Sequence, residues 1–254
     1  MQHERWFPAQ GTTRGVAIVT HGMNLRPERM EDFARFLASI GYDALCPAFT
    51  GHAGSNKEYL GVKAESWEAD ARRFHALAAE RARAAGGVPL VLVAYSFTAA
   101  VFQAMAEELR FDRCIYLAPA LATKSWYRGV IWFAETFRGF TYPSMNMKEY
   151  QVHPRSGSLP FVALDYFLSR WVKAERRAEA VPTLILMDPQ DELLSYPRIM
   201  GYADERPHWR VERVSVAGST LPRKFHHLIV DEPSLGAEEW GRVTRVVAEF
   251  LRAK

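Results

Sequence analysis

The feature that most constrains the fold of this chain is a series of short apolar runs that alternate with helical patterns. The runs Gly15–Thr20, Val88–Ala94 and Thr183–Met187 are apolar almost throughout. Runs of this kind are typical of strands that are covered on both faces in a parallel sheet. Because apolar residues recur at helical spacing between the runs, we predict an α/β domain of three layers, a mostly parallel sheet with helices on both faces.

The same patterns predict the remaining elements. Further strands are expected at Tyr42–Cys46, Arg113–Leu117 and Arg210–Val216. Helices are expected from Pro27 to Ile40, from Ser66 to Gly86, over Phe97–Leu109 and Tyr196–Ala203, and at the C-terminus, where Trp240, Val243, Val247, Phe250 and Leu251 share one face. In such sheets the functional groups lie on loops at the carboxyl ends of the strands. We therefore look for the site where polar residues follow a strand.

Composition narrows the class of protein. The chain has 254 residues, of which 48% are hydrophobic and 24% charged, an ordinary globular balance that argues against disorder and collagen-like repeats. The formal net charge of +3 is too small to indicate a nucleic-acid partner. No apolar stretch approaches the ~20 residues needed to span a bilayer, and the first residues do not resemble a secretory signal. We expect a cytoplasmic protein.

Cofactor and metal sites are not indicated. Cys46 and Cys114 lack metal-like spacing, and both lie in apolar strands as small hydrophobic residues do. The loop that contains Gly22 lacks the lysine and threonine of a phosphate-binding loop. The sequence therefore predicts no metal, no cofactor and no disulfide framework.

A candidate nucleophile lies within Ala94–Thr98, where a buried strand meets a helix with almost no spacer. A serine at this junction is exposed on a sharp turn, and small residues on either side let the strand and helix pack closely. Ala94 and Thr98 stand where glycines are usual, and the β-branched Thr98 is expected to crowd the turn. Ser96 is either a nucleophile or a cap on the following helix.

Three other strand ends carry groups that fit such a serine. His21, Gly22 and Met23 follow the first central strand, where the N–H of Met23, together with that of Phe97, would stabilise a developing oxyanion. These residues also fit an ordinary glycine turn. The motif is therefore informative only in combination with others.

The acid and the base each have two candidates. Asp188 and Asp191 follow the strand Thr183–Met187, and either carboxylate could orient a histidine. His226 and His227 lie on the loop before the last helix, and either imidazole could act as general base and then as general acid. An acidic turn and a structural histidine are the simpler alternatives.

The order Ser, Asp, His at successive strand ends is that of the α/β-hydrolases. From Gly15 to the last helix the chain resembles this superfamily, most closely its carboxylesterase, monoacylglycerol lipase and lysophospholipase-like members. Besides the serine turn, the resemblance rests on His21-Gly22, on the proline–glycine–histidine–glycine loop at Pro47–Ser55 and on Val181–Leu186. It implies a three-layer α/β-hydrolase fold with a helical cap inserted in the core.

The resemblance also implies a choice between the candidates. The family acid follows a proline like Pro182 by nine residues, which selects Asp191 over Asp188. The family histidine precedes an acidic residue by five, which fits His226 with Asp231. Because His227 with Glu232 fits the same rule, His226 is the preferred base and His227 the alternative.

The expected cap is residues 120–180, and the expected core is 1–119 and 181–254. Within the cap, Trp126, Val130, Phe133 and Phe137 recur at helical spacing, and Tyr127, Ile131 and Ala134 broaden this stripe. Trp132 lies on the opposite side. The candidate substrate pocket is Trp126, Val130, Trp132, Phe133 and Phe137. The stripe would form an apolar roof over an acyl group, with Trp132 at the entrance or at a lipid surface, which predicts transient membrane-surface contact. Alternatively, the stripe packs the insertion onto the core.

The sequence predicts a serine hydrolase that cleaves a carboxylic ester with an apolar, medium-chain acyl group through an acyl-enzyme. Ser96, His226 and Asp191 would form the triad, and the N–H groups of Met23 and Phe97 the oxyanion hole. The partner would be a small ester or lipid-like substrate. A thioesterase or amidase with the same triad, or a non-catalytic binding protein of this fold, is the alternative.

Overall fold

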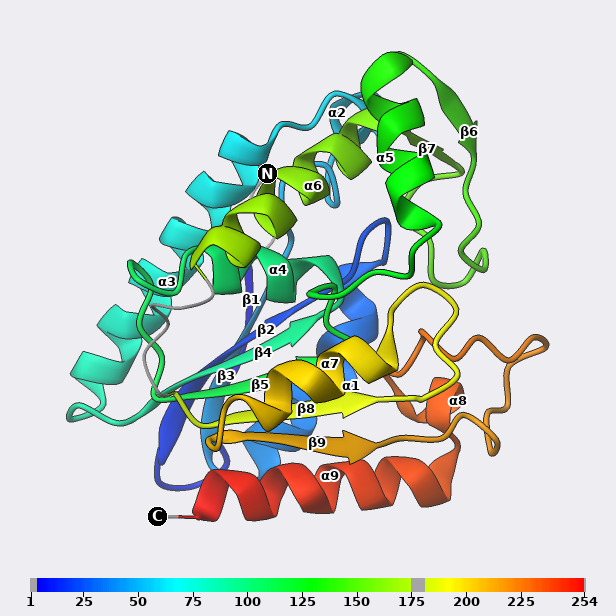
Figure 1. Ribbon diagram of the computed structural model, residues 1–254. Coiled ribbons are helices and arrows are strands. Elements are labelled where there is room, and N and C mark those ends of the chain that lie inside the picture. The colour runs from blue at the N-terminus through cyan, green and yellow to red at the C-terminus, as the bar shows by residue number, and fades with distance from the viewer. Residues whose placement is uncertain (1–3, 175–180, 254) are drawn as a thin grey trace.

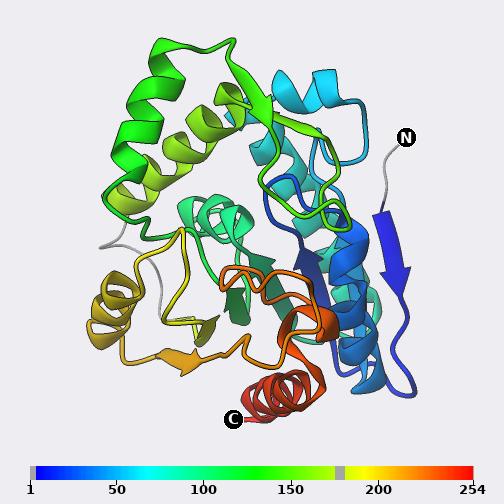
Figure 2. The ribbon, with the colours of Figure 1, turned by 90° about the vertical axis from the view of Figure 1, so that its right-hand side faces the viewer.

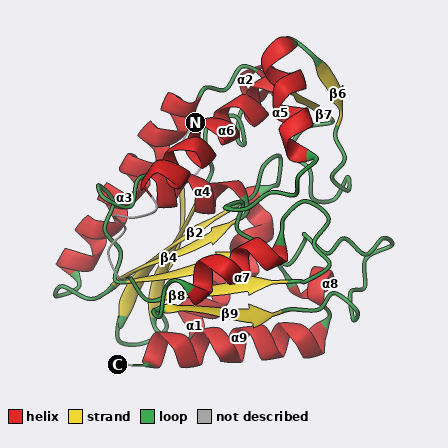
Figure 3. Ribbon diagram, viewed as in Figure 1, coloured by secondary structure: helices red, strands yellow, loops and turns green. Residues whose placement is uncertain are grey.

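The computed structural model describes residues 4–174 and 181–253. The strands are β1 (Glu4–Phe7), β2 (Gly15–Thr20), β3 (Tyr42–Pro47), β4 (Leu90–Tyr95), β5 (Arg113–Leu117), β6 (Thr141–Pro143), β7 (Arg155–Gly157), β8 (Thr183–Met187) and β9 (Trp209–Arg213). The helices are a 3-10 turn (Pro27–Met30), α1 (Glu31–Ser39), α2 (Asn56–Leu60), α3 (Ala64–Ala84), α4 (Phe97–Ala104), α5 (Tyr127–Thr136), α6 (Ser158–Ala174), α7 (Tyr196–Asp204), α8 (Glu232–Leu235) and α9 (Ala237–Arg252) (Figure 3).

The main sheet runs through the middle of the molecule in the order β1-β3-β2-β4-β5-β8-β9 (Figure 1). All neighbouring strands pair in parallel except β1, which pairs antiparallel with β3 at the edge. β4 is the central strand, and all its residues are buried. The predicted three-layer α/β architecture with a mostly parallel sheet is confirmed.

Helices cover both faces of the sheet. α1 and α9 lie on one face, where the rings of Phe33 and Trp240 meet edge to face at 5.2 Å, and α3 and α4 lie on the other (Figures 1 and 2). α4 begins directly after β4, so its first turn lies at the carboxyl edge of the sheet. This edge is where the loops of all the central strands converge.

Several predicted boundaries differ from the observed ones. α4 ends at Ala104, and residues 105–109 continue as turns in place of the expected helix to Leu109. β9 ends at Arg213 because its pairing partner β8 ends at Met187. The edge strand β1 was not predicted. It has only four residues, and its half-exposed pattern carries little hydrophobic signal.

The segment between β5 and β8 contains α5, the small antiparallel sheet β6–β7 and α6. α6 was not predicted as an element. It buries Leu164, Phe167 and Trp171 and packs against both α4 and α5, so it joins the segment to the sheet domain. Residues 175–180, which end the expected cap, lie outside the described residues.

None of the helices within the described ranges is both long enough and apolar enough to cross a membrane.

Candidate active site

Ser96 occupies the sharp turn between β4 and α4. Its backbone φ and ψ are 57° and −117°, a strained conformation for a residue with a side chain, which costs of order 1–3 kcal/mol. The turn is held on both sides, because the Ser96 N–H donates to the Leu117 carbonyl and the Ser96 carbonyl accepts from the Ala120 N–H, each at 3.0 Å. A buried strand that passes directly into a helix thus places this hydroxyl at the edge of the sheet.

Thr98 fits the turn because its hydroxyl is fully bonded. The side chain is buried, and its Oγ1 lies 3.0 Å from the Tyr95 carbonyl, 3.2 Å from the His21 carbonyl and 2.9 Å from the Thr20 hydroxyl, which donates to it. An unsatisfied buried hydroxyl would cost about 1–3 kcal/mol. The threonine that stands in place of a glycine thus has a hydroxyl with partners in the strand and in the loop beside the serine turn.

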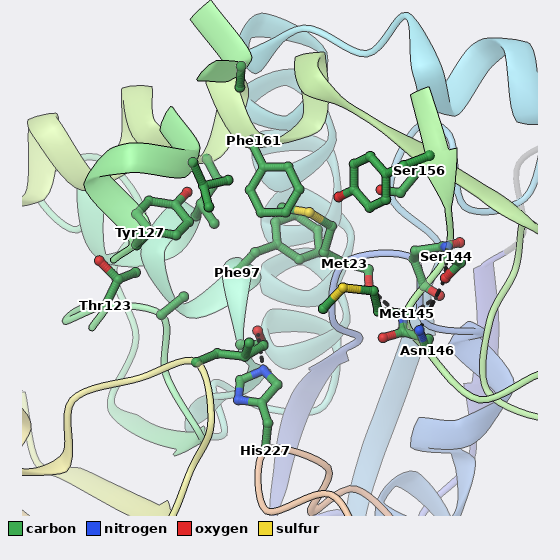
Figure 4. A pocket seen from close by; sticks show the side chains of 18 of the residues that line it. Met23, Phe97, Thr123, Tyr127, Ser144, Met145, Asn146, Ser156, Phe161 and His227 are labelled. Atoms are coloured by element: carbon green, nitrogen blue, oxygen red, sulfur yellow. Dashed lines mark hydrogen bonds between the residues drawn. The ribbon is translucent and has the colours of Figure 1, made fainter. Parts of the chain in front are cut away.

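The histidine that reaches Ser96 is His227. Its Nε2 lies 2.9 Å from Ser96 Oγ, and its Nδ1 lies 2.7 Å from Oδ2 of Asp191. Figure 4 shows the imidazole extending from its loop toward the cavity wall formed by Phe97 and Met23. Groups from three separate strand ends thus form one hydrogen-bonded chain of serine, imidazole and carboxylate.

Asp191 is fully buried and remains charged. Its Oδ1 accepts the N–H groups of Leu193 and Leu194, both at 2.8 Å. Burial by itself raises the pKa of Asp191, but the charge of His227, the hydrogen bond to its ring and the two N–H groups outweigh burial, so the pKa lies below its ordinary value. Since an ionised carboxylate only accepts, Nδ1 of His227 carries the proton and Nε2 accepts from the serine hydroxyl.

The expectation that His226 faces the serine is wrong. His226 and His227 are the central residues of a turn closed by the Leu228 N–H on the Phe225 carbonyl at 2.9 Å, and their side chains leave the turn in different directions. His226 Nδ1 meets Oδ2 of Asp188 at 2.9 Å.

The spacing rule that favoured His226 relied on Asp231, which has another role. Asp231 caps α8, accepting the Ser234 N–H at 2.9 Å, and it also accepts the Tyr150 hydroxyl at 2.9 Å. Its position therefore fixes the start of α8 and does not report which of the two histidines reaches the serine.

Glu192 holds the backbone of the histidine turn and was not singled out from the sequence. Its Oε1 accepts the N–H of His226 and its Oε2 that of His227, each at 3.0 Å. Hydrogen bonds to a charged acceptor are among the stronger ones in proteins. The only available signal was its position next to Asp191, and an acidic residue in a turn is more often a solvated charge.

Met23 and Phe97 line the cavity in front of Ser96, and neither N–H has an acceptor among the described residues (Figure 4). Phe97 is the first residue of α4, where N–H groups have no partner within a helix. Gly22 lets the Met23 loop lie close to the serine turn, because a Cβ there would stand 2.5 Å from the Tyr95 ring. Two N–H groups are thus available beside the serine.

The loop that carries Met23 is held by Asn24 and by the segment between β5 and β8. Asn24 adopts a φ of 50°, and its N–H donates to His52 Nε2 at 3.0 Å. The Asn146 amide donates to the carbonyls of Met23 and Asn24 at 3.2 and 3.1 Å, and the Asn24 amide donates to the Ser144 hydroxyl at 2.9 Å. Single amides without a spacing pattern gave no sequence signal for these roles.

His21 and His52 are buried next to each other, with ring centroids 4.4 Å apart, and neither bonds Ser96. His21 Nε2 accepts the Phe49 N–H at 3.0 Å. Burial lowers the pKa of His21 to about 4, against the smaller opposing effect of its bond to the Gly22 carbonyl, and burial lowers the pKa of His52 as well. Both rings are neutral at pH 7 and support the loop.

A cavity of about 340 Å³ opens beside Ser96 and His227 and extends beneath α5 and α6. Its wall is mostly apolar and includes Trp126, Val130, Tyr127, Phe133, Phe140, Phe161 and Leu164. Trp132 and Phe137, which were expected at the pocket, do not line it. Trp132 is 65% exposed, and Phe137 is half-exposed with its ring 4.8 Å from that of Phe133. The buried residues of α5 are Tyr127, Ile131 and Ala134, which were expected to broaden the stripe.

The two cysteines are buried, and their thiols are not expected to act as nucleophiles. Burial raises the pKa of the Cys114 thiol to about 12, and it raises the pKa of Cys46 as well, so both thiols remain protonated near neutral pH. Within residues 4–174 and 181–253, no three His, Cys, Asp or Glu side chains are placed to hold a metal ion.

A protein-family model described as serine aminopeptidase, S33, matches residues 11–166, more than half of the chain. The chain belongs to this α/β-hydrolase family. In this S33 member the match includes Ser96 and ends before Asp191 and His227, which the structure brings to the serine. None of the curated proteins matches the sequence.

Solved structures similar to this S33 member include lipases and esterases. A soluble variant of monoglyceride lipase from Saccharomyces cerevisiae, in complex with a substrate analog, superposes with a TM-score of 0.76 at 13% identity, covering 98% of this chain and 90% of that one. The monoacylglycerol lipase of Paleococcus ferrophilus gives 0.75 at 14%, covering 99% and 98%. Est1E of Butyrivibrio proteoclasticus with bound ferulic acid gives 0.62 at 16%, covering 98% and 94%. At these identities the likeness shows a shared fold.

Proposed function

We propose that this protein is a serine hydrolase that cleaves carboxylic esters with an apolar, medium-chain acyl group. The observation that carries the proposal is the hydrogen-bonded chain from Ser96 through His227 to Asp191, located where an apolar cavity opens. The strained backbone of Ser96 costs stability. A protein that only binds a ligand would gain nothing from this cost.

In the proposed mechanism, Ser96 Oγ attacks the ester carbonyl while its proton passes to His227 Nε2. The carboxylate of Asp191 stabilises the imidazolium, and the N–H groups of Met23 and Phe97 bind the tetrahedral oxyanion. Collapse of this intermediate expels the alcohol, which takes the proton from His227. Water, deprotonated by His227, then attacks the acyl-enzyme, and the acid leaves as Ser96 regains its proton.

The acyl chain would lie in the apolar cavity, with residues 120–180 acting as its cap over a core of 1–119 and 181–254. Trp126, Val130 and Phe133 from α5 form one wall. The described residues that line the cavity include no Asp, Glu, Lys or Arg, which favours an alkyl chain over a sugar or a strongly charged group.

The outer surface of the cap supports transient contact with a lipid surface. Trp132 is 65% exposed and Met145 is 75% exposed, and Phe137 and Phe140 are about half-exposed nearby in the chain. Exposed apolar groups of this size are typical of interaction sites. A substrate that partitions into such a surface would reach the cavity from there. A cytoplasmic location remains a prediction of the sequence.

The test is a series of p-nitrophenyl esters from acetate to dodecanoate. Each added methylene that is buried contributes up to about 0.8 kcal/mol, so kcat/KM should rise by roughly fourfold per methylene until the cavity is full. Ser96→Ala should lose both turnover and labelling by a fluorophosphonate. Ser66→Ala, on α3 away from the cavity, should keep both.

Two results would count against the proposal in different ways. Turnover retained by Ser96→Ala would remove the serine from the mechanism. If kcat/KM did not change from acetate to octanoate while turnover still required Ser96, the cavity would not bind the acyl chain. The protein would still be a serine hydrolase. Octanoyl thioesters and anilides, assayed in parallel, test whether a thioester or an amide is the better substrate of the same triad.

A further inference from the structure

A second cavity, of about 480 Å³, meets the apolar cavity at Ser96 and His227. From there it extends to Tyr150 and Arg223, which the apolar cavity does not reach. An ester carbonyl at Ser96 has an acyl side and an alcohol side. If the acyl chain fills the apolar cavity, the second cavity is the space left for the alcohol.

The second cavity has polar residues that the first lacks. Tyr95, Tyr150 and Arg223 line it alone, and Ser144 and Asn146 line both cavities. The Tyr95 and Tyr150 hydroxyls donate to the His227 carbonyl and to Asp231, so each can still accept a hydrogen bond. These groups suit a polar alcohol better than a second alkyl chain.

Arg223 gives this wall its charge. Arg223 and His227 are the described lining residues that have a basic side chain. Arg223 forms no ion pair or hydrogen bond with a described residue. The adjacent Lys224 is engaged elsewhere, because its Nζ donates to the Ala217 carbonyl at 2.6 Å.

The described carboxylates around the site form no ion pair with Arg223, because each has other partners. Asp191 is bonded to His227, and Glu192 to the backbone N–H groups of the histidine turn. Asp231 caps α8 and lies 3.6 Å from the Arg29 guanidinium. Arg223 therefore lines the second cavity as an exposed guanidinium that has no ion-pair partner among the described residues.

We propose that the second cavity binds the leaving alcohol and that Arg223 selects alcohols that carry an anionic group, a carboxylate or a phosphate. The proposal rests on the proposed function, because only an ester held at Ser96 divides its two sides between the two cavities. His227 lines both cavities at their junction, which is where the imidazolium must protonate the departing oxygen. Guanidinium groups bind carboxylates and phosphates through paired hydrogen bonds.

The experiment uses two octanoate esters with leaving groups of the same shape, 4-hydroxybenzoate and its neutral amide, 4-hydroxybenzamide. For each protein, kcat/KM for the anionic ester is divided by kcat/KM for the neutral ester. This ratio should be about five- to tenfold higher in the wild type than in Arg223→Gln, mainly because the anionic ester has a lower KM in the wild type. The difference should shrink as ionic strength rises, because the contact is open to solvent. Arg245→Gln, an exposed arginine of α9 outside both cavities, should leave the ratio unchanged.

A second pair of substrates separates the two sources of the anion. Octanoylglycerol phosphate is compared with octanoylglycerol, and the phosphate preference should depend on Arg223 if phosphate is the bound group. A ratio unchanged by Arg223→Gln for both pairs, with Ser96-dependent hydrolysis intact, would overturn the subsite and leave the proposed function standing. Absence of Ser96-dependent hydrolysis of even the neutral esters would overturn the proposed function itself.

Discussion

Two histidine–aspartate pairs lie side by side at the carboxyl edge of this sheet. His227 bonds Asp191 at 2.7 Å, and His226 bonds Asp188 at 2.9 Å, in both cases through Nδ1. The surroundings differ, because the His227 side chain is 7% exposed and that of His226 is 27% exposed. Only the Nε2 of His227 faces a hydroxyl. Pairing with a carboxylate is therefore common to both histidines, and the direction of the second ring nitrogen distinguishes them.

The second pair has a structural explanation. Besides His226, Asp188 accepts the N–H of Gln190 at 2.8 Å and that of Val216 at 3.3 Å. It thereby ties the loop after β8 to the chain that leaves β9 and to the histidine turn. The Asp188 pair holds the loops in place, and the Asp191 pair lies against the serine.

Replacing each histidine separately is the strongest test of this difference. His227→Ala removes the proposed base and should lower kcat/KM for the octanoate ester by roughly 10⁴- to 10⁶-fold. His226→Ala should change it by less than about tenfold and should lower the melting temperature. Equal losses in both variants, or the larger loss in His226→Ala, would contradict the assignment.

The acids give a second matched pair of variants. Asp191→Asn keeps the shape of the loop but no longer stabilises the imidazolium, so turnover should fall by about 10⁴-fold. Asp188→Asn should reduce turnover by about tenfold at most and lower the free energy of unfolding by about 1–3 kcal/mol through its lost hydrogen bonds. Denaturant unfolding together with steady-state kinetics separates the two outcomes. If Asp188→Asn gave the larger loss of turnover, Asp188 and not Asp191 would be the acid that supports the base.

A histidine without an acid partner should behave in a third way, as a source of acid sensitivity. The pKa of His21 is about 4 in the folded protein and about 6.5 when unfolded, so the unfolded chain binds the extra proton between these values. Stability contributed by neutral His21 is therefore present above pH 6.5 and lost as the pH falls toward 4, by about 3 kcal/mol in all.

Urea unfolding between pH 7 and 4.5 measures this dependence. His21→Gln should give a shallower loss of stability with falling pH than the wild type, whatever its stability at pH 7. His226→Gln should keep the steep loss. If the free energy of unfolding fell equally steeply with pH in the wild type and in His21→Gln, the neutral form of His21 would not be a source of the acid sensitivity.

Replacing Glu192 should lower turnover far less than replacing His227 or Asp191. Glu192→Ala leaves the N–H groups of His226 and His227 without their acceptors, so kcat should fall by about tenfold while KM stays within twofold. Glu192→Gln keeps one acceptor oxygen and should be intermediate. Glu65→Gln, an exposed acid on α3, serves as the control. A drop in melting temperature with unchanged kcat would make Glu192 a structural residue only.

The sequence predicted best the elements whose apolar signal is strongest. The buried strands Arg113–Leu117 and Thr183–Met187 have the predicted bounds, because continuous apolar runs between polar residues mark both ends. The edge strand Glu4–Phe7 and the helix Ser158–Ala174 were missed. The first is short and half-exposed, and the second has apolar residues around much of its circumference, so its period is weak.

In the segment between β5 and β8, the sequence predicted a helix but did not predict which of its side chains are buried. Periodicity placed Trp126, Val130, Phe133 and Phe137 on one stripe, with Tyr127, Ile131 and Ala134 at its border. In α5 the border residues are the buried ones, and Phe137 is half-exposed and does not line the cavity. Periodicity gives the angle between side chains around a helix. Which side faces the core depends on the neighbouring helix.

Sequence alone determined the α/β architecture and the strand ends at which Ser96, Asp191 and the histidine loop lie. It did so because hydrophobic alternation and the strand-to-helix turn are local properties of the chain. Only the tertiary structure decided between His226 and His227, which are adjacent in the chain and satisfy the same spacing rule. The decision depends on a turn at 225–228, on the Glu192 carboxylate that holds its N–H groups and on the position of Ser96, which is 131 residues away in the chain. Contacts between such distant residues leave no pattern in either local segment.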